Sequence, residues 1–282
     1  MKITILNQEF DINLYKLNLS YIKLQTFPVE IGNFINLQEL YLSGNKLTSL
    51  PAEICNFINL QKLYLSNNKF TSLPVEIGNL IKLQILDLFA NKLTSLPAEI
   101  GNLINLQKLY LSVNQLTNLP VEIGNLINLQ QLYLSNNKLQ NLPAKIGNLI
   151  NLQNLNLQDN QLQSLPAEIC NLCNLKYLNL ENNKLQSLPA EIRCLINLDI
   201  IYLENNKLQS LPTGILEIKE ILNIDESSYD LDNININNEI LIFRCDKIKL
   251  SNLPFNTKEI WLNPNTVNND IKLPFSCMIK YY

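Results

Sequence analysis

Hydrophobic and polar residues follow one another along this chain in an order that returns every 23 residues. The unit that begins at Leu37 reads LQELYLSGNKLTSLPAEICNFIN, and the unit that begins at Leu60 reads LQKLYLSNNKFTSLPVEIGNLIK. Steps of 23 residues locate nine regular units over residues 14–220, which begin at residues 14, 37, 60, 83, 106, 129, 152, 175 and 198. A fixed period of this length indicates a solenoid in which each unit forms one coil.

Each unit opens with L-x-x-L-x-L, where the leucines share one face of a short strand. One strand cannot bury its leucines alone, but stacked copies form a parallel sheet with strands about 4.8 Å apart. Each aliphatic side chain contributes about 1.5–3 kcal/mol when it is buried. The core residues expected in the unit that begins at residue 106 are Leu106, Leu109, Leu111, Leu116, Leu119, Ile123 and Leu126.

Two further positions predict how each coil turns. An asparagine recurs where the chain leaves the strand, and an inward amide can satisfy backbone groups that have no strand partner there. A Leu-Pro pair follows, and proline holds the residue before it extended. About ten residues remain for the outer side, which suffices for a short 3₁₀ helix or one helical turn. The asparagines are Asn45, Asn68, Asn91, Asn114, Asn137, Asn160, Asn183 and Asn206.

The full pattern, L-x-x-L-x-L-x-x-N-x-L-x-x-L-P-x-x-I-x-x-L, resembles the leucine-rich repeat family. The variant LP-x-E-I-G-N-L is most similar to intracellular scaffold proteins of the Ras-pathway type and the plant Ras-group type. This resemblance implies an α/β solenoid, a right-handed horseshoe with a parallel concave sheet and short 3₁₀ or helical segments on the convex side. It also implies a role in protein–protein interaction.

The two ends of the array depart from the regular unit. Ile22 takes the asparagine position of the first unit, as is typical of a terminal coil with a neighbour on one side only. We expect residues 1–13 to form an N-terminal cap that contains a strand or hairpin. Residues 221–282 are interpreted as degenerate, shorter repeats that form a C-terminal cap, because residues 249–254 read KLSNLP. At least two further strands of the same sheet are expected within residues 221–262; a small separate domain is the alternative.

Composition narrows the range of functions. The net charge of −3 gives no basic surface, so nucleic acid is not an expected partner. The absence of histidine rules out histidine-based catalytic triads and zinc sites, and no phosphate-binding glycine motif occurs. The glutamates of the outer side recur at one spacing with no pocket among them, so a glycosidase pair is not expected. We therefore expect a protein that is not an enzyme, with no catalytic residue and no cofactor.

The segment MKITILNQEFDIN has too short an apolar run for a signal peptide, and no stretch could span a membrane. We expect a cytoplasmic monomer that does not bind membranes. Six cysteines without a secretory signal favour a reducing compartment. Cys55 and Cys170 replace glycines and Cys173 replaces an isoleucine, which indicates buried or half-buried free thiols. The alternatives are a metal site that includes Cys170, Cys173 and Cys194, and a disulfide.

The concave face is formed by strand residues that point away from the core. Tyrosine supplies rigid contact area and is enriched at protein interfaces, so this face is the candidate for partner binding. The alternative is that stacked tyrosines only stabilise the sheet. Its central column contains Tyr41, Tyr64, Asp87, Tyr110, Tyr133, Asn156, Asn179 and Tyr202.

The unit at residues 83–105 departs from its neighbours, because Ile85, Asp87 and Phe89 replace the lysine, tyrosine and serine of the other units. Two apolar groups beside one acid are typical of an anchor site, and we expect the three side chains to converge between Tyr64 and Tyr110. Sequence drift is the alternative. Acidic residues favour a basic segment on the partner at the C-terminal half of this face. They are Asp159, Glu181, Asp199 and Glu204.

The sequence therefore predicts a scaffold that binds a protein partner of unknown identity. A recognition subunit or adaptor for a phosphatase or ubiquitin ligase is the alternative. No helical ligase-binding segment is expected, because only 13 residues precede the array.

Overall fold

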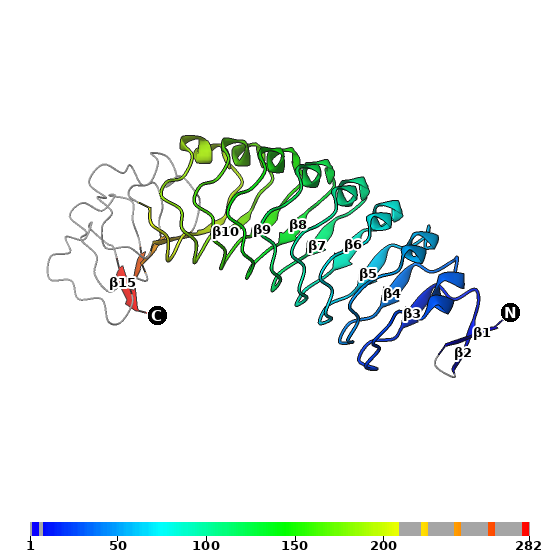
Figure 1. Ribbon diagram of the computed structural model, residues 1–282. Coiled ribbons are helices and arrows are strands. Elements are labelled where there is room, and N and C mark those ends of the chain that lie inside the picture. Colours follow the sequence, from blue (N-terminus) through cyan, green and yellow to red (C-terminus); the bar gives the residue numbers. More distant parts are fainter. Residues whose placement is uncertain are drawn as a thin grey trace.

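A computed structural model of the chain describes the backbone of residues 2–5, 8–208, 221–224, 240–243, 259–262 and 278–281, and the side chains of residues 8–208. The coils stack into an open arc, with the strands along its inner side and the short helices along its outer side (Figure 1). The predicted solenoid, with a parallel sheet on one side and short 3₁₀ segments on the other, is confirmed.

The strands are short, and each pairs in parallel with the strand of the next coil, so that one sheet of 13 strands results. Between regular coils the register is 23 residues, as in the pair Tyr64 and Asp87. The strands of this sheet within residues 1–208 are β3 (Lys16–Asn18), β4 (Glu39–Tyr41), β5 (Lys62–Tyr64), β6 (Ile85–Asp87), β7 (Lys108–Tyr110), β8 (Gln131–Tyr133), β9 (Asn154–Asn156), β10 (Tyr177–Asn179) and β11 (Ile200–Tyr202).

Five-residue 3₁₀ helices form the outer side of the coils. Each begins directly after the proline of a Leu-Pro or Phe-Pro pair, because proline presets the backbone and supplies no N–H. Neighbouring helices pack closely: a Cβ atom added at Gly124 would lie 2.4 Å from the carbonyl oxygen of Lys145. The helices are η1 (Val29–Asn33), η2 (Ala52–Asn56), η3 (Val75–Asn79), η4 (Ala98–Asn102), η5 (Val121–Asn125), η6 (Ala144–Asn148), η7 (Ala167–Asn171) and η8 (Ala190–Cys194).

The core between these two layers consists of leucine, isoleucine and phenylalanine side chains. All seven core residues expected in the unit that begins at residue 106 are buried, and only Leu119 retains as much as 6% exposure. Phe34, Phe57 and Phe70 are the largest fully buried side chains. The prediction of one continuous apolar core through the regular coils is therefore confirmed.

The recurring asparagines join neighbouring coils, as predicted. Asn114 accepts a hydrogen bond from the Leu93 N–H at 3.0 Å, and its amide donates to the Leu88 and Leu111 carbonyls at 2.9 and 3.0 Å. The same three bonds recur at every position of the column from Asn45 to Asn206. Buried backbone groups at the turns are thereby satisfied.

At the N-terminal end, β1 (Lys2–Ile5) and β2 (Gln8–Asp11) form an antiparallel hairpin, and Phe10 packs edge-on against Phe34. At the other end, β12 (Ile221–Ile224), β13 (Ile240–Phe243), β14 (Glu259–Leu262) and β15 (Met278–Tyr281) extend the sheet. The strands expected within residues 221–262 are thus present. Residues 249–254, which suggested shortened repeats, lie outside the described residues, and the division into repeats and caps stays a prediction.

The expectation for the cysteines is partly wrong. Cys170 is buried and Cys55 is half-buried, but Cys173 and Cys194 are exposed. Cys173 replaces an isoleucine that is itself exposed in the neighbouring coils, and Cys194 ends η8 where the other helices end in asparagine. Burial raises the pKa of the Cys170 thiol to about 12, so this thiol is protonated at neutral pH. The remaining two cysteines of the sequence, Cys245 and Cys277, lie outside the described residues.

Candidate binding site on the concave sheet

The sheet register places the predicted site residues in one row across the concave face. Asp87 pairs with Tyr64 on one side and with Tyr110 on the other, and Tyr133 follows Tyr110. The row continues to Tyr202 on β11. Its members are half-buried except for Asn179, which is buried.

Tyrosines that are neighbours in this row stack on one another. The Tyr41 and Tyr64 rings lie 4.6 Å apart between centroids, and the Tyr110 and Tyr133 rings lie 5.3 Å apart. Asp87 separates the two stacks. Ring stacking therefore does stabilise the sheet face, as the alternative interpretation of the tyrosines expects, but it leaves a gap at the shorter aspartate side chain.

A hollow of about 370 Å³ lies at this gap. It is lined by Asp87, Phe89, Tyr110, Ser112, Tyr133 and Ser135. The hollow thus brings together four of the eight predicted site residues. Phe89, with 40% of its surface exposed, is the large apolar side chain that lines the hollow.

Ile85 does not line this hollow, and the expected convergence of Ile85, Asp87 and Phe89 at one anchor site stays a prediction. Ile85 pairs with Lys62 and Lys108 at the other end of the strand. The row also extends well past the hollow on both sides, so Tyr41, Tyr64 and Tyr202 lie outside it.

Asp87 has an unusual electrostatic environment. Its Oδ1 accepts a hydrogen bond from the Phe89 N–H at 3.0 Å, and the Ser66 hydroxyl also hydrogen-bonds to it. Burial nevertheless raises the pKa of Asp87 above its ordinary value, because burial disfavours the charged form more than these bonds favour it. Within residues 8–208, no lysine or arginine forms an ion pair with this carboxylate.

The fold does not require a charge at this position. In three other coils an asparagine at the same register accepts the same bond from the N–H two residues later. These asparagines are Asn18, Asn156 and Asn179. An amide therefore supports the turn as well as Asp87 does, and the negative charge is an addition that the local structure does not use.

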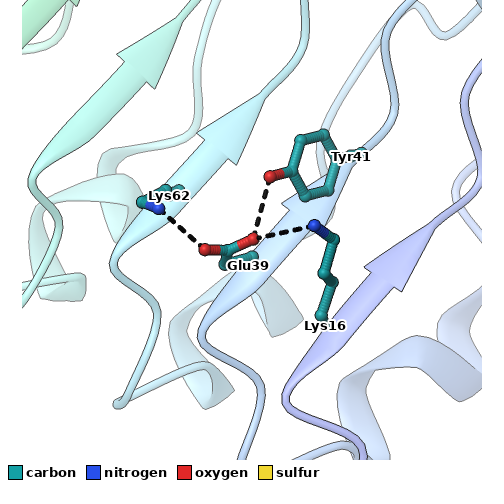
Figure 2. A network of polar contacts seen from close by, with 4 residues as sticks. All are labelled: Lys16, Glu39, Tyr41 and Lys62. Atoms are coloured by element: carbon teal, nitrogen blue, oxygen red, sulfur yellow. Dashed lines mark hydrogen bonds and ion pairs between the residues drawn. The ribbon is translucent and has the colours of Figure 1, made fainter.

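Glu39, on the same face, is fully engaged by its neighbours (Figure 2). Lys62 donates to Glu39 Oε1 at 2.8 Å, the Tyr41 hydroxyl donates to Oε2 at 2.8 Å, and Lys16 Nζ lies 3.4 Å from Oε2. The bonds from Lys62 and Tyr41 lower the pKa of Glu39 to about 2. Lys16 Nζ also lies 4.9 Å from the centroid of the Tyr41 ring.

The backbone beside the hollow carries strain. The turn after each strand requires a residue with positive φ, and six coils place glycine, asparagine or aspartate there, which adopt this conformation readily. Two of the three coils that line the hollow place Ala90 (φ 53°) and Val113 (φ 58°) at this position, and the first coil of the array places Tyr21 (φ 61°) there. For a β-branched residue such as Val113 this conformation is unfavourable, and such residues cluster at functional sites.

Two other surface features were not expected from the sequence. Gln and Asn side chains from the entry side of the strands line a second hollow of about 370 Å³. Beside it, one isoleucine per coil lies exposed, although its recurrence in the apolar pattern gave no sign of exposure. The exposed isoleucines are Ile35, Ile58, Ile81, Ile104, Ile127, Ile150 and Ile196.

Within the described part of the chain, no group of three or more histidine, cysteine, aspartate or glutamate side chains could hold a metal ion. No helix within them is both long and apolar enough to cross a membrane.

An open arc of stacked coils with one parallel sheet along its inner side defines a solenoid repeat protein. Family comparison identifies the repeat: a leucine-rich repeat region matches residues 53–138, and leucine-rich repeats match residues 12–70, 128–149 and 150–208. A leucine-rich repeat protein of Leptospira interrogans has 38% sequence identity and a TM-score of 0.75, with 89% of this chain and 73% of that chain covered. The chain belongs to the leucine-rich repeat family.

Two other solved structures share the fold. A TDR receptor has 24% identity and a TM-score of 0.68 over 89% of this chain, which spans 55% of the length of the receptor. Internalin C2 of Listeria monocytogenes has 26% identity and a TM-score of 0.60, with 70% of this chain and 86% of that chain covered. A comparison with curated proteins found no match. Leucine-rich repeat proteins are generally protein–protein interaction modules and are typically not enzymes.

Proposed function

We propose that this protein is a non-enzymatic scaffold that binds a partner protein on its concave sheet, at the hollow beside Asp87 and Phe89. The observation that carries the proposal is the gap in the tyrosine row, where an exposed phenylalanine and a half-buried acid face the same hollow. Aromatic side chains at the centre of an interface provide much of its binding energy, because they bury large rigid surfaces.

The features of this coil favour binding over sequence drift. The charge of Asp87 and the positive φ of Ala90 and Val113 each reduce stability, and all three residues adjoin one hollow. Tyr21 in the terminal coil also has positive φ, but within the regular coils that follow, the unfavourable residues at this turn position adjoin the hollow. Their position supports a functional role, because local departures from an otherwise consistent fold mark functional sites.

The repeat variant LP-x-E-I-G-N-L supports a role similar to that of the Ras-pathway and plant Ras-group scaffolds, hence a cytoplasmic, monomeric protein that binds another protein. The net charge of −3 disfavours nucleic acid as the partner. A partner that is a phosphatase or a ubiquitin ligase would make this chain the recognition subunit of that enzyme.

The proposal is tested by restoring the repeat consensus at the hollow. The double variant Asp87→Tyr/Phe89→Ser carries the residues found at these positions in neighbouring coils, so we expect its fold to be retained. Proteins captured by the wild-type chain would be purified without regard to the variant, and their affinities for wild type and for the double variant would be measured by calorimetry. We expect the double variant to lose about 2 kcal/mol or more of binding free energy.

Ile104→Ser serves as the matched control, because it removes an exposed apolar side chain of the isoleucine row, outside the hollow. Full affinity of the control with loss in the double variant supports the proposal. If every purified partner binds the double variant as tightly as the wild type, the hollow is not the binding site.

A further inference from the structure

We propose that the hollow between β6 and β8 receives a cationic side chain, a lysine or an arginine, from the partner protein. This inference rests on the proposed function and specifies the chemistry of the same site. It is drawn from the charge of Asp87, from the aromatic walls and from a second place on the same sheet where the chain itself supplies the cation.

The charge requirement comes from Asp87. The carboxylate is half-buried and receives one backbone and one hydroxyl hydrogen bond, neither of which neutralises it. Lys62, on the adjacent strand, is already engaged by Glu39 at 2.8 Å, and Lys108 lies beside Ile85 at the other end of the strand pair. A ligand that covers the hollow without a positive charge would bury the carboxylate further, which is unfavourable.

The aromatic walls favour a cation as well. Tyr133 covers one face of the Tyr110 ring, and because β7 lies between β6 and β8, the other face is turned toward Asp87. Phe89 adds a second exposed ring to the same hollow. A cation over an aromatic face gains roughly 0.5–2 kcal/mol according to how much water is removed.

The network around Glu39 shows the same combination with its cation in place (Figure 2). Lys16 Nζ lies 3.4 Å from the Glu39 carboxylate and 4.9 Å from the centroid of the Tyr41 ring. At the central hollow the carboxylate of Asp87 and the ring of Tyr110 are present, but the described residues supply no cation. The geometry points to the partner as the source of the missing charge.

The size of the hollow agrees with this assignment. A volume of about 370 Å³ lies at the lower end of the range of small-molecule pockets, roughly 300–1,000 Å³. A long side chain from an extended segment of the partner can therefore enter, with its stem against Phe89 and its charged group beside Asp87. Further along the same face, Asp159 and Glu181 favour additional basic residues in that segment.

The test uses random twelve-residue peptides displayed on phage and selected on the full chain. Peptides that bind wild type but not Phe89→Ser are retained and synthesised. In each, every lysine is replaced by norleucine and every arginine by citrulline, which keep the aliphatic stem of the side chain and remove the charge. Affinities are measured by calorimetry for wild type and for Asp87→Asn, which keeps the turn hydrogen bond that Asn156 and Asn179 make in their own coils.

We expect one basic residue in each retained peptide whose neutral replacement weakens binding to wild type by about tenfold or more, and to Asp87→Asn by less than about twofold. Retained peptides that bind equally well without any positive charge would overturn the inference and leave the proposed function intact. If no selected peptide depends on Phe89, both the inference and the proposed function are wrong.

Discussion

Two regions of the concave sheet contain the same kinds of residues in different states. Around β4, Glu39 is bound by Lys16, Lys62 and Tyr41, and its pKa falls to about 2. Around β6, Asp87 receives no cation from the described residues, and burial raises its pKa. The register and the asparagine column are the same in both regions, and the difference in the state of the two carboxylates comes from the surface side chains around them.

The two regions also differ in how many unfavourable features they contain. Around β4, Glu39 is paired with lysines, and the coils of β4 and β5 place Gly44 and Asn67 at the turn positions that require positive φ, although the terminal coil places Tyr21 there. The central region leaves a carboxylate without a cation and places Ala90 and Val113 at those positions. A scaffold that tolerates such losses within a regular array retains them most readily where they serve binding.

The largest loss of stability is expected from substitution of the buried asparagines below the sheet face, and it should be equal in the two regions. Asn68→Ala and Asn114→Ala each remove three hydrogen bonds to buried backbone groups, so each variant should lose about 2–4 kcal/mol of unfolding free energy. Urea denaturation followed by circular dichroism measures both. Losses that differ by more than about 1 kcal/mol would mean that the regions also differ in their scaffold.

Substitutions at the turn positions should change the unfolding free energy by a smaller amount, and with opposite sign in the two regions. Val113→Asn relieves a strained φ of 58° and should gain about 1 kcal/mol, because the valine is 42% exposed and loses little packing. Asn67→Val, at the corresponding turn two coils earlier, should lose about the same. Thermal unfolding of the two variants measures both changes. If Val113→Asn is no more stable than wild type, the backbone at Val113 is not strained.

The repeat period explains which features could be predicted from the sequence. Leu109 and Asn114 recur at fixed positions. A recurring leucine needs a core, and a recurring inward asparagine needs unpaired backbone groups at a turn, so both the core and the turns could be predicted from the repeat. The hollow could not be located in this way, because it depends on the length difference between Asp87 and a tyrosine and on Tyr133 two coils away. Ile85, which sequence spacing groups with Asp87 and Phe89, does not line the hollow.

The exposed cysteines and isoleucines show a second limit. An apolar residue that recurs in every unit suggests a core position, yet Ile81 and Ile104 lie on the surface, where their carbonyls accept hydrogen bonds from the asparagines of the next coil. Cys173 is exposed for the same reason. Which side of a loop faces water depends on the path of the backbone between helix and strand, and the pattern of residue types does not contain that path.

A smaller effect on stability is expected from Asp87 itself. Its folded-state pKa is above the unfolded value, so its contribution to stability is most favourable when it is protonated and is lost as the pH rises through that pKa. Asp87→Asn should therefore be more stable than wild type at neutral pH. The difference should vanish below about pH 4, and a variant that is less stable at neutral pH would contradict this assignment.

The smallest effect should come from Glu39 and have the opposite sign. Its folded-state pKa is lowered to about 2, so its contribution is present above about pH 4.3 and is lost as the pH falls toward 2. Because water reaches both lysine partners, with 56% of the Lys16 side chain and 35% of the Lys62 side chain exposed, Glu39→Gln should lose only about 0.5 kcal/mol at neutral pH. Denaturant titrations at neutral pH and near pH 3 measure this loss, and a gain at neutral pH would be inconsistent with a satisfied carboxylate.

We propose that Asp87, whose carboxylate has no cation from the described residues, binds a positive charge of the partner. Glu39, whose carboxylate is already bound by two lysines, does not. The most direct test is the affinity of one purified partner, or one peptide with a basic anchor residue, for wild type, Asp87→Asn and Glu39→Gln in the same buffer. We predict binding weaker by about tenfold or more for Asp87→Asn and by less than about twofold for Glu39→Gln. Equal losses in the two variants, or a larger loss in Glu39→Gln, would contradict the account.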